Sequence, residues 1–285
     1  TNLICLDFKS ARIYLPSTLS NLKKLTSIKF QLENTEGLES ITTISSLTNL
    51  MINFNTTSKK RLDLQQLKNL KQLEYISNTT QFDDADYTLP SNINQLRELE
   101  RLDITINKSP IEINQLSNLK RLSVRYINSD LFPKIDFSQN TSLEYLIFDN
   151  YNEDLKTPRI KFDKEFEKLT NLSYILFYNV PIEMNVTNQF TSLFNATHPN
   201  PNVSMLKYLS IYNLETNIPN KIEGVLNICN NHDIMLEIAG TSPQTIDYRN
   251  KSLTKDTYFS LDLKDSNNPL IIVDDVQKYF WRNLL

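Results

Sequence analysis

The amino-acid sequence predicts a solenoid of stacked coils, with one short strand per coil and therefore a parallel β-sheet. Its apolar residues recur at steps of three, three and two, as in Leu22, Leu25, Ile28 and Phe30. The step of two is the alternation of a strand with one buried face, and the steps of three suit a tight helical or 3-10 turn that leads into it. One such unit cannot bury its apolar edge alone, so neighbouring units must stack and pair their strands.

The pattern recurs along most of the chain. It is complete in residues 22–30, 96–104, 116–124 and 169–177, and partial copies lie between and beyond them. Aligned on the third apolar residue, the copies centre on Leu6, Ile28, Ile52, Ile76, Leu102, Leu122, Leu146, Ile175, Leu209 and Leu236. The intervals between these residues run from 20 to 34, a spacing typical of repeat proteins built from stacked coils.

Two segments carry the most specific signal. Residues 15–25 read LPSTLSNLKKL, and residues 89–99 read LPSNINQLREL. Both resemble the LPxxLxxLxxL passage of the leucine-rich repeat family, which leads from the convex side of a coil into its strand. The resemblance covers about residues 1–240. It implies an α/β solenoid, a right-handed leucine-rich-repeat superhelix with a parallel concave sheet and an irregular or 3-10 convex side.

The sequence departs from this family just after the strands, where members usually carry Asn. Here only Asn107 lies at that position, and the others are Glu33, Gln81, Ile127, Tyr151, Val180 and Leu214. We therefore expect irregular turns and an imperfect arc.

Two regions are expected along the chain. Residues 1–240 form the solenoid, with about nine to ten repeats. No N-terminal cap precedes the first repeat, so we expect the parent protein to extend upstream. Residues 241–285 form a C-terminal capping segment, with a strand at 258–263 and a short amphipathic helix at 274–284. A partner-docking tail is the alternative for that helix.

In such a solenoid, the neighbours of the buried strand residues point out from the concave sheet. These outward positions carry arginines in the middle units, and tyrosines with two aliphatic residues in the later units. The same alignment predicts that Tyr75 also points outward. The ligand-binding candidates are Tyr145, Tyr174, Tyr178, Tyr208, Tyr212, Ile147, Leu176, Arg101, Arg121 and Arg125. Parallel strands lie ~4.8 Å apart, so these side chains should form one patch.

Two interpretations of the patch are open. Contiguous apolar surface often marks a binding site, and Tyr and Arg are enriched at interface hot spots. Alternatively, the tyrosines stack on one another and merely complete the sheet. The two longest intervals, 29 and 34 residues, lie between the same late units, so inserted loops such as 195–202 are expected beside the patch.

Composition argues against several function classes. The net charge of -3, from 30 basic and 33 acidic residues, gives no strong field for nucleic acid or an anionic membrane. Three glycines in 285 residues exclude the usual glycine-rich phosphate loops. No apolar run approaches the ~18–20 residues of a membrane-spanning helix. The Cys229 and His232 pair has no second pair to complete a zinc site. The acids at 83–86 and 274–275 lack the cleft of a glycosidase.

The expected function is a non-enzymatic protein- or peptide-binding module that uses its concave face and needs no cofactor or metal. The alternative is a structural arm or scaffold of a larger assembly or cell-surface layer. Cysteine-rich caps of extracellular animal members are missing, which favours an intracellular or a bacterial surface or secreted protein. Nine N-x-S/T sequons do not establish secretion, because chance predicts roughly six. Cys5 and Cys229 are expected as free thiols, with a bridge between them as the alternative.

Overall fold

The computed structural model describes residues 2–11, 15–32, 37–54, 62–77, 90, 92–106, 111–126, 134–150, 166–178, 208–212, 235–239 and 259–260. Its strands are β1 (Cys5–Ala11), β2 (Ser27–Leu32), β3 (Asn49–Phe54), β4 (Gln72–Ser77), β5 (Arg101–Ile106), β6 (Arg121–Tyr126), β7 (Tyr145–Asn150), β8 (Tyr174–Tyr178), β9 (Tyr208–Tyr212), β10 (Met235–Ala239) and β11 (Phe259–Ser260). They form one sheet whose order follows the sequence, and every neighbouring pair is parallel.

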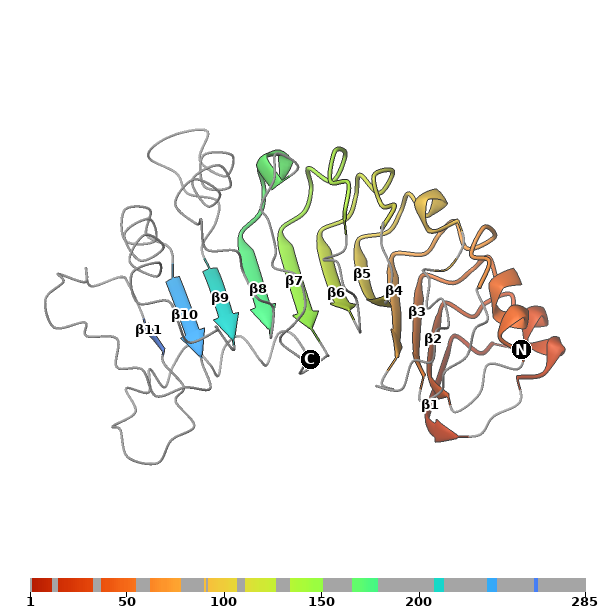
Figure 1. The fold of residues 1–285 in the computed structure, drawn as a ribbon. Coiled ribbons are helices and arrows are strands. Elements are labelled where there is room, and N and C mark those ends of the chain that lie inside the picture. Colours follow the sequence, from red (N-terminus) through yellow and green to blue (C-terminus); the bar gives the residue numbers. More distant parts are fainter. Residues whose placement is uncertain are drawn as a thin grey trace, which may run out of the picture.

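This strand order makes the chain a parallel β-solenoid, because each coil adds one strand beside the strand of the coil before it. Figure 1 shows the strands side by side along an arc, from β1 at one end to β11 at the other. All ten strands predicted from the repeat are present as β1 to β10. The strand expected at residues 258–263 is present as β11, which pairs with β10. The helix expected at 274–284 lies outside the described residues.

Short 3-10 helices precede several strands and lie on the outer margin of the arc (Figure 1). They are η1 (Ser17–Asn21), η2 (Leu38–Thr43), η3 (Ile93–Gln95) and η4 (Phe166–Lys168). The steps of three produce them, since a 3-10 helix has three residues per turn and places residues i and i+3 on one side. The structure therefore confirms a solenoid but not an α/β one: in the described coils the helical turns are the four 3-10 helices, and none is an α-helix.

Two of these turns begin in a left-handed backbone conformation. Gly37, before η2, has φ 79°, and Asn92, before η3, has φ 64°. A Cβ on Gly37 would meet the carbonyl oxygen of Leu15 in the preceding coil. One of only three glycines in the sequence therefore lies where both the backbone angle and the close approach of two coils require it.

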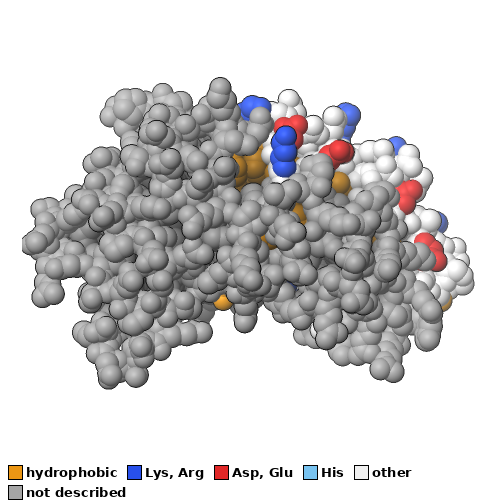
Figure 2. Space-filling model, viewed as in Figure 1, with side chains coloured by type: hydrophobic (Ala, Val, Ile, Leu, Met, Phe, Trp, Pro, Cys, Tyr) orange, Lys and Arg blue, Asp and Glu red, His pale blue; other side chains and the backbone are white. Residues whose placement is uncertain are grey.

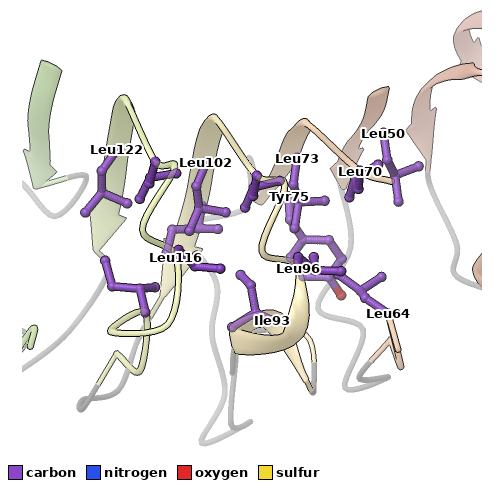
Figure 3. Close-up of a cluster of buried hydrophobic side chains, with 14 of the residues drawn as sticks. Leu50, Leu64, Leu70, Leu73, Tyr75, Ile93, Leu96, Leu102, Leu116 and Leu122 are labelled. Atoms are coloured by element: carbon purple, nitrogen blue, oxygen red, sulfur yellow. The ribbon is translucent and has the colours of Figure 1, made fainter. Parts of the chain in front are cut away.

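The core is a stack of leucine and isoleucine layers between the strands and the turns. In the coil that leads into β5, Leu96, Leu99 and Leu102 are fully buried, and Ile93 is nearly so. Figure 3 shows Ile93, Leu96 and Leu102 packing between side chains of the coils on either side, among them Leu70 and Leu116. Full burial of such a side chain stabilises the fold by roughly 1.5–3 kcal/mol before the entropy of ordering the chain is subtracted.

Strand pairing corrects the predicted alignment in two coils. Ile28 pairs with Leu50, and Leu50 pairs with Leu73, so Ile52 and Ile76 are not the third apolar residues of their coils. In β3 the error is two residues and leaves each side chain on its predicted face. In β4 it is three residues, and an odd slip exchanges the two faces of a strand. Leu64, Leu67, Leu70, Leu73 and Ile76 are equally spaced, so the predicted alignment carried the steps of three one step too far, from Leu73 to Ile76.

Tyr75 is therefore a core residue, although the sequence alignment placed it outward. It is 4% exposed and packs edge-on against Phe54, with ring centroids 4.7 Å apart. Ile76, predicted to be buried, is half-buried on the other face, while Ser77 is fully buried. Tyr126, in β6, is also fully buried. Burial raises the pKa of both phenols, and the carboxylate of Asp149 contributes at Tyr126.

These two buried phenols predict a late step in an alkaline titration. A tyrosine held neutral by burial stabilises the fold fully below its unfolded pKa of about 10, and this contribution is lost as the pH rises above that value. Tyrosinate absorbance of the folded protein should therefore rise in an early step from accessible tyrosines and in a later step that accompanies unfolding. The double variant Tyr75→Phe, Tyr126→Phe should lose amplitude in the late step only. A single early step for all 13 tyrosines, with circular dichroism unchanged, would contradict this.

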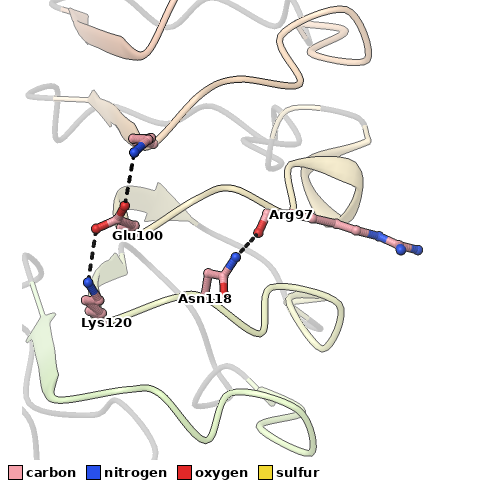
Figure 4. Close-up of polar contacts among 5 residues, drawn as sticks. Arg97, Glu100, Asn118 and Lys120 are labelled. Carbon is pink, nitrogen blue, oxygen red and sulfur yellow. Dashed lines mark hydrogen bonds and ion pairs between the residues drawn. The ribbon is translucent and has the colours of Figure 1, made fainter.

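Polar contacts join each coil to the one before it on the turn that enters the strand. The side-chain amides of Asn69, Asn118 and Asn171 donate to the carbonyl oxygens of Ser45, Arg97 and Thr141, at 2.9, 3.0 and 2.7 Å. Figure 4 shows the second of these bonds beside Glu100, which lies between Lys71 and Lys120 at 3.6 and 3.2 Å. The positions just after the strands, where leucine-rich-repeat proteins usually carry Asn, lie outside the described residues.

β1 is one of the two edge strands of the described sheet. Phe8 is 41% exposed there, whereas Phe30, its partner in β2, is 1% exposed. Leu3 and Ile4 are also exposed, so the apolar stack is open to solvent at this edge. Cys5 is an exposed free thiol, as predicted, and Cys229 lies outside the described residues. No helix in the described ranges is long and apolar enough to span a membrane.

Candidate interaction face

Along the strands, side chains alternate between the core and a second surface, which we call the sheet face. The strand pairings align its residues in rows that cross the strands. The first row is Cys5, Ser27, Asn49, Gln72, Arg101, Arg121, Tyr145, Tyr174, Tyr208 and Met235. The second row is Asp7, Lys29, Met51, Glu74, Asp103, Ser123, Ile147, Leu176, Ser210 and Glu237. From β5 onward the third row is Thr105, Arg125, Asp149, Tyr178, Tyr212 and Ala239.

The sheet face changes character between β6 and β7. On β5 and β6 the rows carry charged and small polar residues, and on β7 and β8 they carry three tyrosines, Ile147, Leu176 and Asp149. All the predicted site residues therefore lie at register positions of one face. Tyr208 and Tyr212 extend the first and third rows on β9, where only their strand positions are described.

The apolar end of the face is built on β7 and β8. The rings of Tyr145 and Tyr174 lie side by side, with centroids 5.9 Å apart and planes 40° from parallel. Ile147 and Leu176 are paired on these strands and are half-buried, and Tyr178 is 43% exposed. On these two strands the predicted residues therefore lie next to one another, and the rings of Tyr145 and Tyr174 contact each other in a tilted arrangement.

The charged part of the face centres on a buried carboxylate. Asp103 lies 2.6 Å from Nε of Arg101 on its own strand and 3.5 Å from Nε of Arg121 on β6. The side chain of Asp103 is 5% exposed, while those of Arg101 and Arg121 are 34% and 19% exposed. An acid taken this far out of water needs charged partners, and two arginines on neighbouring strands supply them.

A second ion pair joins β6 to β7. Arg125 and Asp149 face one another in register, with Nε and Oδ2 3.0 Å apart. Burial raises the pKa of Asp149, and the charge and hydrogen bond of Arg125 oppose that rise. The three arginines predicted as a polar flank are therefore held by carboxylates rather than extended into solvent.

Sequence reasoning did not select Asp103 or Asp149 as site residues. The signal was present: in Arg101-Leu-Asp103 the two charged residues are separated by one position, and residues i and i+2 of a strand share a face. Arg125 and Asp149 occupy the same column of the repeat. Opposite charges at such positions predict ion pairs once the strand register is known.

The corrected alignment also changes where the long insertions between repeats lie relative to the tyrosines. The interval from Leu73 to Leu102 is 29 residues, as long as that from Leu146 to Ile175. Long insertions are therefore not confined to the coils beside the tyrosines. The inserted residues themselves, including 195–202, lie outside the described residues.

No metal-binding cluster occurs on the described ranges. They contain no group of three or more His, Cys, Asp or Glu side chains placed to hold a metal ion. His198, Cys229, His232 and the acids at 83–86 and 274–275 lie outside these ranges. In Figure 2, acidic and basic side chains are interspersed on the visible part of the described surface.

Comparison of the chain with protein-family models and with curated proteins finds no match.

Proposed function

We propose that this chain is a non-enzymatic binding module of the leucine-rich-repeat type, and that its sheet face binds a protein or peptide. The repeat itself supports the family: the LPxxLxxLxxL segments, the steps of three that become 3-10 turns, and one parallel strand per coil all agree. A solenoid of this kind offers a long, rigid surface on which rows of side chains keep fixed spacings.

The observation that carries the proposal is the composition of the sheet face on β7 and β8. A face of a sheet that met only water would favour polar residues at alternate positions. Here five of the six alternate positions are Tyr145, Ile147, Tyr174, Leu176 and Tyr178, and the sixth is Asp149. Large aromatic and aliphatic side chains gathered on adjacent strands, beside half-buried arginines, are the composition of an interface core.

Substitution in this patch should weaken partner binding without unfolding the solenoid. The double variant Tyr145→Ser, Tyr174→Ser removes the paired rings, and its control, Lys29→Ser, Gln31→Ser, changes the same sheet face on β2. A partner is identified by affinity capture and mass spectrometry, and its affinity is then measured for each variant by calorimetry. We expect at least about tenfold weaker binding for the tyrosine variant and no change for the control. Equal affinities in folded variants would refute the assignment.

A further inference from the structure

The first row of the sheet face changes from basic to aromatic residues along the solenoid. On β5 to β9 it reads Arg101, Arg121, Tyr145, Tyr174 and Tyr208, and each of these residues is paired in register with the next. Two guanidinium positions are thus followed by three phenol positions in a straight line across the strands. Strands are spaced ~4.8 Å apart, so the line covers about 19 Å.

The two arginines are oriented by the carboxylate they share. Both contact Asp103 through Nε, on its Oδ2 and Oδ1 atoms respectively. Among the described residues, Asp103 is the only acceptor of either side chain. Each guanidinium therefore keeps its two terminal amino groups for another acceptor, since Arg carries five N–H donors in a planar fork.

The three groups in contact, Arg101, Arg121 and Asp103, carry a net charge of +1, and their side chains are 34%, 19% and 5% exposed. Glu74 lies beside Asp103 on β4, but among the described residues it forms no ion pair with either arginine. A positive charge in partly dehydrated surroundings attracts an anion more strongly than the same charge in water. The planar forks of neighbouring arginines fit a carboxylate, which accepts two parallel hydrogen bonds.

We propose that the sheet face binds an extended acidic–apolar peptide along this row, with a carboxylate on Arg101 and Arg121 and an apolar or aromatic side chain on Tyr145 and Tyr174. This inference rests on the proposed function and specifies its ligand. The centres of the two pairs are two strand spacings, ~10 Å, apart. A peptide in the extended polyproline II conformation advances ~3.1 Å per residue with three residues per turn, so side chains three positions apart lie on the same side and ~9 Å apart. The acidic and the apolar residue are therefore about three positions apart in the ligand.

A selection from a random dodecapeptide library displayed on phage tests this directly, because it needs no identified partner. The protein is presented as the wild type and as the Tyr145→Ser, Tyr174→Ser variant. We expect the wild type to enrich sequences with Asp or Glu about three residues from an aromatic or aliphatic residue. Enriched apolar sequences without an acid would overturn the acidic specificity and leave the proposed function standing. No enrichment over the tyrosine variant would overturn both.

A matched pair of triple variants then locates the carboxylate site. Arg101→Gln, Asp103→Asn, Arg121→Gln removes two positive charges and one negative charge from the sheet face and leaves no unpaired buried charge. Lys71→Gln, Glu100→Gln, Lys120→Gln removes the same charges from the strand-entry turns, where Glu100 lies between the two lysines (Figure 4). Folding of both is checked by circular dichroism and thermal unfolding.

The enriched peptide and its Asp→Asn or Glu→Gln analogue are titrated against all three proteins. We expect about tenfold or greater loss of affinity for the sheet-face variant, and for the amide analogue on the wild type. The amide analogue should lose nothing further on the sheet-face variant, because the two changes remove the same contact. Equal losses in both triple variants would show nonspecific charge attraction and overturn the proposal.

Discussion

Replacing Asp103 by alanine is expected to lower the free energy of unfolding by about 3 kcal/mol, because it leaves two arginines without their shared partner. Removing one member of a buried ion pair generally costs ~3–5 kcal/mol. The expectation is set at the lower end of that range because Arg101 and Arg121 keep 34% and 19% of their side-chain exposure, so water screens part of their repulsion.

Glu100 provides the control for this experiment. It lies between Lys71 and Lys120 much as Asp103 lies between its arginines, but its side chain is 39% exposed. The neighbouring lysines hold the pKa of Glu100 below its ordinary value, and such exposed pairs contribute little to stability. Glu100→Ala should therefore change urea unfolding far less than Asp103→Ala does. Equal midpoints for the two variants would show that the burial of Asp103 has no energetic consequence.

The two acids differ because of where the repeat places them. Asp103 lies inside β5, on the sheet face, whereas Glu100 lies on the turn that enters the strand. In the sequence alone, Asp103 and Glu100 are both acidic residues close to Arg101, and nothing distinguishes their surroundings. Only the strand register brings Arg121 to Asp103, and only the packing of the sheet face determines that Asp103 loses its water.

The fold was predictable because the apolar residues that specify it recur at regular steps along the sequence. A step of two and a step of three each correspond to one backbone geometry, and the repetition across ten coils removed the ambiguity of any one of them. The same periodicity caused the error at β4. Leu64, Leu67, Leu70 and Leu73 are equally spaced, so nothing local shows where the turn ends and the strand begins, and Tyr75 was placed on the wrong face.

The candidate site was predictable only in part, for a related reason. Residues on one face of one strand follow from alternation, so Tyr145 with Ile147 and Tyr174 with Leu176 could be assigned from the repeat. Contacts between side chains depend on register and rotamer, which the repeat does not encode. The ring contact of Tyr145 with Tyr174 and the ion pair of Arg125 with Asp149 therefore required the structure.

Asn140 is the clearest interruption of the apolar pattern, and its replacement by aspartate is expected to cost about 4 kcal/mol or more at neutral pH. It occupies the position that Leu116 holds in the preceding coil and Leu169 in the next, and it is fully buried. Its amide nitrogen donates to the carbonyl oxygens of Ile113 and Leu116, at 3.1 and 2.9 Å. A carboxylate there would direct negative oxygen at two carbonyl oxygens with no water to separate them.

The pH dependence separates this mechanism from a simple loss of hydrogen bonds. In the variant Asn140→Asp, burial beside two carbonyl groups would raise the folded-state pKa of the introduced carboxyl group above its unfolded value of about 3.9. Below that value both states are protonated and the deficit should be small. As the pH rises, the unfolded chain ionises first and stability falls by about 1.4 kcal/mol per pH unit until the folded-state pKa is reached.

Asn118→Asp is the matched control, because Asn118 also donates its amide to a carbonyl of the preceding coil but is exposed to solvent. Water can solvate the new carboxylate there, so urea unfolding between pH 4 and pH 8 should show little change, on the order of 0.5 kcal/mol or less. A pH-independent loss at both sites would mean that the hydrogen bond alone matters. A loss confined to Asn140→Asp and growing with pH would show that the buried amide links two coils at a point where the solenoid excludes charge. The same burial makes Asn140, although it begins one of the sequons, inaccessible to glycosylation in the folded chain.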